Sequence, residues 1–121
     1  MIRKITIERR EKLAGSGINF FVVMNFDRCE FEQNVGMKER LTLGAKSQFL
    51  RDSKQVFPLT NGEIITIDSL DMSNSFFVVA FTSAGRLFSE IIVVDEEDFD
   101  VRYAVTLKLG LFKNQFVIDK L

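Results

Sequence analysis

The amino-acid sequence predicts an all-β fold: an antiparallel β-sandwich of about eight strands, forming a single domain over residues 1–121. Three observations lead to this prediction. Apolar and polar residues alternate with a period of two along several segments, as they do in half-buried strands. Short apolar runs, rich in β-branched and aromatic residues, are separated by turn residues. Finally, 46% of the residues are hydrophobic and no linker divides the chain, so the length suffices for one core.

The first part of the chain predicts two strands and one segment for which two interpretations remain. Residues 5–8 alternate between isoleucine and polar side chains, and a glycine turn at 15–17 leads to an apolar run at 20–24. That run is apolar on both faces, which favours a central strand. Residues 30–50 mix charges, apolar residues and glycines, and two interpretations remain open: a short helix around 37–41 or an irregular pair of strands.

The middle of the chain predicts a hairpin over residues 59–67. Its centre is Asn61-Gly62, because this dipeptide favours positive φ at both central positions of a hairpin turn. Pro58 lies just before the turn, where a missing backbone donor matters least.

The last part of the chain predicts a second hairpin and two further strands. Residues 76–81 and 91–94 are apolar on both faces and are connected through a tight turn at 83–85. Residues 101–109 show the longest alternation in the sequence, and residues 115–119 form the final strand.

The residue types that are missing restrict the chemistry. The chain contains no histidine and one cysteine, Cys29, so it cannot form Ser-His or Cys-His pairs or a cysteine-based zinc site. Glycine-rich phosphate-binding motifs are also absent. Chemistry by carboxylates or lysines stays open. We therefore predict a protein that is not an enzyme and uses no cofactor or metal.

Charge and hydropathy predict the compartment. The net charge is -1, without the basic excess of a dedicated nucleic-acid-binding domain, so we expect no nucleic acid as partner. No basic-then-apolar segment opens the chain, and the longest apolar run, residues 76–81, is too short for a membrane span. With one unpaired cysteine, these features predict a cytoplasmic location.

An acidic run near residue 97 is the densest charge feature. Its carboxylates are candidate calcium ligands, because hard cations prefer several carboxylate oxygens close together. The run does not match the spacing of an EF-hand loop, and a solvated loop between two apolar strands is the interpretation that we favour. The candidate ligands are Asp95, Glu97, Asp98 and Asp100.

The two halves of the chain differ in charge. Residues 1–60 contain eleven basic and seven acidic residues, whereas residues 61–121 contain five basic and ten acidic residues. Two interpretations fit this asymmetry. Strands from the two halves can pair and neutralise each other, which we favour, or the halves can steer contact with a charged partner.

An interaction surface is the functional class that the sequence favours. The chain has 13 phenylalanines, and its two-faced strands need cover on both sides, whereas a small sandwich covers only one. Either residues 30–50 or another chain supplies that cover, and we expect a homo-oligomer or an unidentified protein partner. The candidate surface residues are Phe20, Phe76, Arg9, Arg10 and Lys12.

The sequence therefore predicts a non-enzymatic interaction or accessory domain. The alternative is a small β-barrel carrier that binds an apolar small molecule in a cavity lined by phenylalanine. The uninterrupted apolar runs disfavour the carrier, because the outside of such a barrel needs polar residues on nearly every strand.

Two short motifs carry a resemblance to a known group of proteins. The pattern I-x-I-x-R at residues 5–9, followed by L-T-N-G-E at residues 59–63, resembles small bacterial β-sandwich modules related in outline to PEGA-type domains. The resemblance implies an Ig-like sandwich and a non-catalytic role, and it transfers no catalytic residue. Residues 30–56 depart from the pattern as an insertion.

Overall fold

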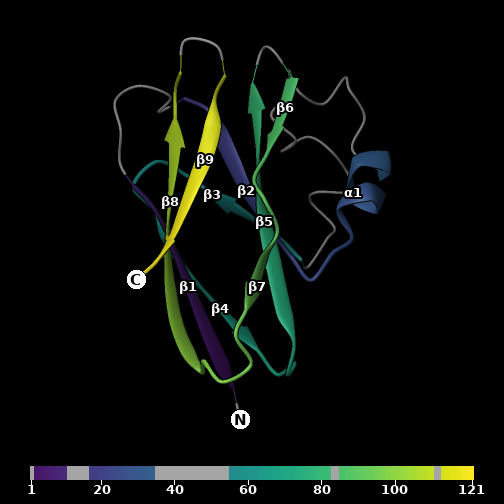
Figure 1. The fold of residues 1–121 in the computed structure, drawn as a ribbon, viewed down its shortest axis with the longest axis vertical. Helices are drawn as coiled ribbons and strands as arrows, with labels where there is room; N and C mark the ends of the chain where they lie inside the picture. Colours follow the sequence, from purple (N-terminus) through teal and green to yellow (C-terminus); the bar gives the residue numbers. More distant parts are fainter. Residues whose placement is uncertain (1, 11–16, 35–54, 83–84, 111–112) are drawn as a thin grey trace.

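The computed structural model describes residues 2–10, 17–34, 55–82, 85–110 and 113–121. In these residues nine strands form two sheets that pack face to face, and one short helix lies on the outer side of the second sheet (Figure 1). The predicted all-β sandwich is therefore confirmed. The elements are β1 (Arg3–Arg9), β2 (Asn19–Met24), α1 (Arg28–Asn34), β3 (Val56–Leu59), β4 (Ile64–Ser69), β5 (Asn74–Thr82), β6 (Gly85–Phe88), β7 (Ile92–Val94), β8 (Asp100–Lys108) and β9 (Gln115–Lys120).

The first sheet has the strand order β4-β1-β8-β9 and one polar face. Along β1, Ile5 and Ile7 are buried toward the second sheet, while Lys4 is exposed on the outer face, as the alternation predicts. The strands β1 and β8 run parallel, with Ile5 opposite Val101. The prediction of a purely antiparallel sandwich is wrong for this pair. Its two strands are far apart in sequence, so no short turn fixes their relative direction.

The second sheet is apolar on both faces at its centre. Its order is β3-β2-β5-β6, and β7 pairs with the first part of β5. Residues 20–24 and 76–81 form the two central strands β2 and β5, as predicted. Because side chains alternate between faces, Phe20 belongs to the core between the sheets and Phe21 to a second core on the outer side.

A bulge divides one edge of this sheet into β6 and β7. Between the pairs Val79–Phe88 and Phe76–Ile92, three residues on the edge lie opposite two on β5. Within the bulge, the Ser89 hydroxyl accepts the Val78 N–H at 2.8 Å.

The hairpin predicted over residues 76–94 is thus confirmed for β5 and β6. The turn residues 83 and 84 lie outside the described part of the chain. The prediction that residues 91–94 are a central strand is wrong. They form a short edge, in which 77% of Val93 and 51% of Ile91 are exposed.

The predicted hairpin at Asn61-Gly62 is also wrong. β3 belongs to the second sheet and β4 to the first, so the turn between them crosses from one sheet to the other. Its backbone closes with the Glu63 N–H donated to the Thr60 carbonyl at 2.9 Å. Gly62 has a φ of 79°, whereas Asn61 has no positive φ. One positive φ, at the third residue, fits a type II turn, which does not hold two strands in one ladder as a type I′ turn does.

Aromatic rings from both sheets meet in the core between them. Phe20 meets Phe116 edge to face with 5.1 Å between ring centroids, and Phe76 meets Tyr103 at the same separation. Two open sheets packed on these rings are a sandwich, not the closed barrel of the carrier alternative.

Helix α1 covers the outer face of the second sheet. Phe31 is fully buried and makes edge-to-face contacts with Phe77 at 5.6 Å and Phe88 at 6.2 Å. The helix starts at a capping residue, because the Asp27 Oδ1 accepts the Glu30 N–H at 2.9 Å. The chain itself therefore supplies cover for the second apolar face. The helix predicted around residues 37–41 lies outside the described residues.

Candidate functional site

Both phenylalanines that the sequence analysis assigned to an interaction surface lie in the core. The exposed fraction is 2% for Phe20 and 1% for Phe76, and both pack between the sheets. Their assignment to an interaction surface is wrong, because the alternation in β2 and β5 turns them toward the first sheet.

The basic cluster does not form the predicted surface either. Arg9 is 4% exposed, its guanidinium donates to the Leu59 carbonyl at 2.9 Å, and burial lowers its pKa. Arg10 is exposed and lies 4.0 Å from the Glu8 carboxylate. Lys12 lies outside the described residues. Arg9 therefore has a structural role, and of this cluster only Arg10 is seen on the surface.

The acidic run forms the turn between β7 and β8. The Asp95 carboxylate accepts the Glu97 N–H at 3.0 Å, and the Asp98 carboxylate accepts a 2.6 Å hydrogen bond from Lys120, which raises the pKa of that lysine. Asp100 is exposed at the start of β8. No group of three or more histidine, cysteine or acidic residues in the described chain could hold a metal ion. The candidate calcium site gains no support.

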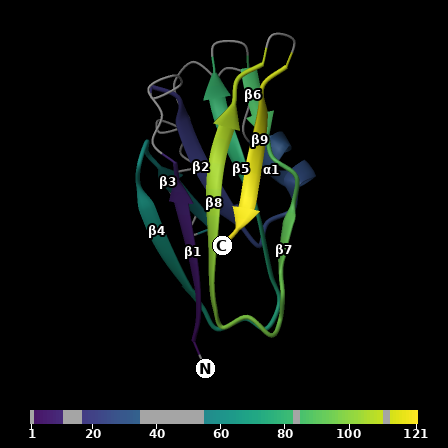
Figure 2. The same cartoon turned by 60° about the vertical axis from the view of Figure 1, so that its left-hand side comes forward.

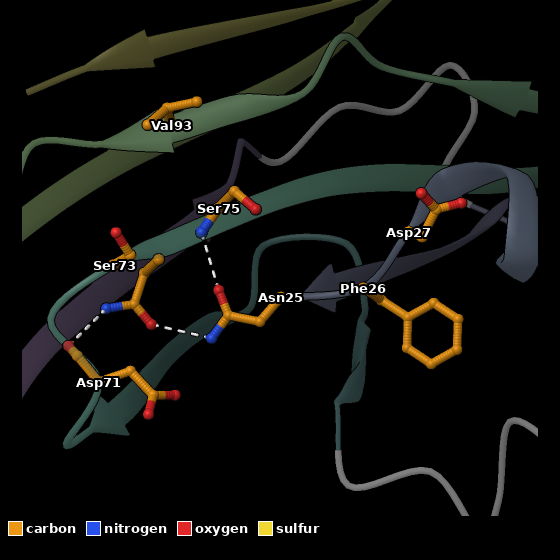
Figure 3. A pocket seen from close by; sticks show the side chains of 8 residues that line it. Asn25, Phe26, Asp27, Asp71, Ser73, Ser75 and Val93 are labelled. Carbon is orange, nitrogen blue, oxygen red and sulfur yellow. Dashed lines mark hydrogen bonds between the residues drawn. The ribbon is translucent and has the colours of Figure 1, made fainter.

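An open hollow of about 570 Å³ lies where β2 ends and β5 begins (Figure 3). It brings together the β2–α1 connection, the β4–β5 connection and the edge strand β7. None of the residues singled out from the sequence lines it. The lining residues are Asn25, Phe26, Asp27, Asp71, Ser73, Asn74, Ser75 and Val93.

The inner wall of the hollow is a network of amide hydrogen bonds. Asn25 adopts a left-handed conformation with a φ of 52°, which asparagine tolerates better than most residues. Its side chain donates to the Asn74 Oδ1 at 3.0 Å and accepts the Ser75 N–H at 2.9 Å (Figure 3). Asn74 is 3% exposed and donates to the Asp71 carbonyl at 3.1 Å. The network fixes the backbone of both connections.

The rim of the hollow is acidic and apolar. The side chains of Asp27 and Asp71 are exposed at its edge, and so is Val93. The Ser73 hydroxyl donates to the Glu96 carboxylate at 3.1 Å and so ties the rim to the acidic turn. The hollow can hold a cationic or hydrogen-bond-donating group. Its amides and the Ser73 hydroxyl are already in hydrogen bonds, which suits binding rather than proton transfer.

Some of this could have been found in the sequence. Asp27 and Glu30 have the spacing of a capping box, and Phe26 and Phe31 flank them as a hydrophobic staple, which together mark a helix start. The two rings meet edge to face at 6.3 Å. No local signal shows that Asn25 and Asn74 come together, because their contact depends on the pairing of β2 with β5.

Comparison with known proteins gives a likeness of fold. No protein-family model matches the chain, and no curated protein matches it. Lip from Serratia marcescens, described as a membrane bound component of the Type VI secretion system, has a similar structure with a TM-score of 0.52 and 12% identity. That similarity covers 99% of this chain and 96% of Lip. The Type VI lipoprotein TssJ1 from Pseudomonas aeruginosa has a TM-score of 0.47 and 14% identity over 100% of this chain and 96% of its own.

The comparison with Lip overturns one prediction. The chain shares its fold with a protein described as membrane bound, so the expectation of a cytoplasmic location is wrong on this finding. No helix among the described residues is long and apolar enough to cross a membrane. The resemblance to PEGA-type modules stays a prediction.

Proposed function

We propose that this chain is a non-enzymatic, protein-binding component of a membrane-associated bacterial secretion assembly. The observation that carries the proposal is the shared fold with Lip, which extends over nearly the full length of both chains. The domain acts by holding another component of the assembly in place, and its rigid two-sheet core keeps the connecting loops in fixed positions for that contact.

The chemistry of the described surface supports binding over catalysis. The chain has no histidine, and the hollow presents amides, hydroxyls and carboxylates. Exposed carboxylates and apolar side chains beside such a hollow are groups that bind a partner through charge and apolar contact.

The partner in this proposal is a different protein rather than a second copy. The expected homo-oligomer rested on an apolar sheet face without cover, and Phe31 of α1 covers that face. Light scattering on the purified domain is expected to show a monomer at low and at high salt. A dimer at both would favour a second copy instead.

The experiment that tests the function is made in the bacterium that encodes the chain. A short epitope tag follows Leu121, which is 56% exposed at the end of the described chain, and cell fractions are probed for the tag. We expect the tagged protein in the membrane fraction, in a complex with proteins of a secretion system, and loss of secreted effectors when its gene is deleted. The untagged gene, supplied on a plasmid, restores secretion. A protein found free in the soluble fraction, with secretion unchanged after deletion, would contradict the proposal.

A further inference from the structure

One end of the sandwich collects several chain segments into one surface. The start of β1, the β4–β5 connection and the β7–β8 turn meet there, at the lower end of Figure 1 beside the N-terminus. Figure 2 shows the same three segments side by side at the lower end after a turn about the vertical axis. We call this surface the acidic end. It consists of the start of β1, residues 68–73, residues 93–100 and the hollow described above.

The loops of the acidic end are held in place by hydrogen bonds. The Arg3 Nη2 donates to the Glu96 carbonyl at 2.6 Å, and the Lys4 N–H donates to the Phe99 carbonyl at 2.8 Å. With the Ser73–Glu96 hydrogen bond, these contacts join all three segments. A surface that is already ordered loses little conformational entropy when it binds.

Exposed apolar side chains concentrate at the acidic end. Of the nine large hydrophobic residues that are exposed in the described chain, five lie here. Exposed apolar side chains that share one end of a domain with polar ones are typical of a protein-binding surface. Its members, with their exposed fractions, are Ile2 (53%), Leu70 (77%), Met72 (69%), Val93 (77%) and Phe99 (44%).

The exposed charge at this end is mainly negative. Six exposed carboxylates surround the apolar side chains, whereas Lys4 is the exposed base that the described residues place among them. Lys120 lies nearby but is bound to Asp98. The carboxylates belong to Asp68, Asp71, Asp95, Glu96, Glu97 and Asp100. Such a surface attracts a basic partner and repels the anionic headgroups of a membrane.

A buried arginine supports the β7–β8 turn from beneath. Arg3 is 2% exposed, and its guanidinium carbon lies 5.8 Å from the centroid of the Phe99 ring. Its Nη1 has no hydrogen-bond partner among the described residues and is closed off from solvent. Arg3 therefore orders the turn from inside and does not itself contact a partner.

We propose that the acidic end binds a positively charged segment of a partner protein. A lysine or arginine of that segment occupies the hollow between Asp27 and Asp71, and apolar residues beside it contact Leu70, Met72 and Val93. This inference rests on the proposed protein-binding function and adds which surface acts and what chemistry the partner brings.

Site-specific photo-crosslinking in the native bacterium tests the inference. A photoreactive residue replaces Met72 at the acidic end or, as a control, Leu109, an apolar residue 47% exposed at the opposite end of β8. We expect a crosslink from position 72, mapped by mass spectrometry to a segment containing lysine or arginine, and none to that segment from position 109.

A charge reversal supplies the second measurement. Asp71→Lys is expected to reduce the yield of the crosslink at position 72 about tenfold, because it removes the attraction to a basic segment. Asp119→Lys, the same change at an exposed position on β9, is expected to leave the crosslink intact. Thermal unfolding of both variants checks that the fold is kept. The Asp71 side chain is exposed, so we expect no loss of stability.

Several results would overturn the inference. One is the absence of a crosslink from position 72, or a crosslink from it to a second copy, to lipid or to a segment without basic residues. Another is capture of the same partner with equal yield from position 109. A third is a crosslink yield that Asp71→Lys does not change. If the chain still joined a secretion assembly through another face, the proposed function would stand and only this inference would fall. Capture of a basic segment from a protein outside any secretion system would instead contradict the proposed function.

Discussion

The guanidinium of Arg9 lies over the ring of Phe20, with 3.5 Å between its Cζ and the ring centroid. Arg9 belongs to β1 in the first sheet, Phe20 to β2 in the second, and the guanidinium also donates to the Leu59 carbonyl at the end of β3. The Arg9 N–H in turn donates to the Glu63 carbonyl. One cation therefore joins the two sheets at the corner where the chain crosses between them.

Replacing Arg9 with alanine is expected to lower the free energy of unfolding by about 3 kcal/mol. The substitution removes the stacking on Phe20 and leaves the buried Leu59 carbonyl without that donor. Urea denaturation of both proteins measures the difference. Arg10→Ala is the control, because Arg10 is exposed, and its effect is expected to stay within about 0.5 kcal/mol. Equal losses in the two variants would show that the contacts of Arg9 do not stabilise the fold.

Replacing Phe31 with alanine is expected to uncover the second apolar face. A fully buried phenylalanine leaves a large cavity, so we expect a loss of about 3–5 kcal/mol in the free energy of unfolding. In the variant, the rings of Phe77 and Phe88 lose this cover and should promote association. Light scattering would then show a molecular mass that rises with protein concentration. Cys29→Ala, at an exposed position of the same helix, serves as the control. A Phe31→Ala protein that stays monomeric and as stable as this control would refute the covering role.

Two glycines are expected to respond in opposite ways to alanine. A Cβ at Gly110 would clash with the Lys113 backbone carbonyl, whereas a Cβ at Gly17 meets nothing within 4 Å. Gly110→Ala should therefore lower the free energy of unfolding by about 1–3 kcal/mol, because the backbone after β8 must shift. Gly17→Ala should be neutral or raise stability by up to about 1 kcal/mol, through a less flexible unfolded chain. Melting temperatures of the two variants check both signs, and the prediction fails if Gly110→Ala melts no lower than Gly17→Ala.

Stability is expected to decline in alkaline solution, partly because of Tyr103. Burial raises the pKa of its phenol above the ordinary value of 10.0. Above pH 10 the unfolded chain loses this proton while the folded protein keeps it, so the free energy of unfolding falls as the pH rises through that window. Below pH 10 the contribution is complete. The pKa of Lys120, raised by its hydrogen bond to Asp98, acts in the same direction.

Urea denaturation between pH 9 and 11 measures this decline. Tyr103→Phe keeps the ring but removes the ionisable group, so the variant is expected to lose stability less steeply than the parent protein. An identical slope in the two proteins would rule out the buried phenol as a source of the alkaline decline.

The strands could be predicted because their signal is local. Alternation along residues 101–109 and the apolar runs at 20–24 and 76–81 reflect how each segment meets a core, and they correspond to β8, β2 and β5. The start of helix α1 also has a local signal, the capping-box spacing of Asp27 and Glu30 with the staple of Phe26 and Phe31.

The sequence by itself determined that this chain is a β-sandwich with more apolar strand surface than one core can cover. Only the tertiary structure decided how that surface is used. It turned Phe20 and Phe76 inward, placed Phe31 over the outer face, made Arg9 a bridge between sheets and brought Asn25 to Asn74. A period of two shows that a strand has two faces. It does not show which distant segment covers each face, because cross-strand partners are chosen by packing between residues far apart in the chain.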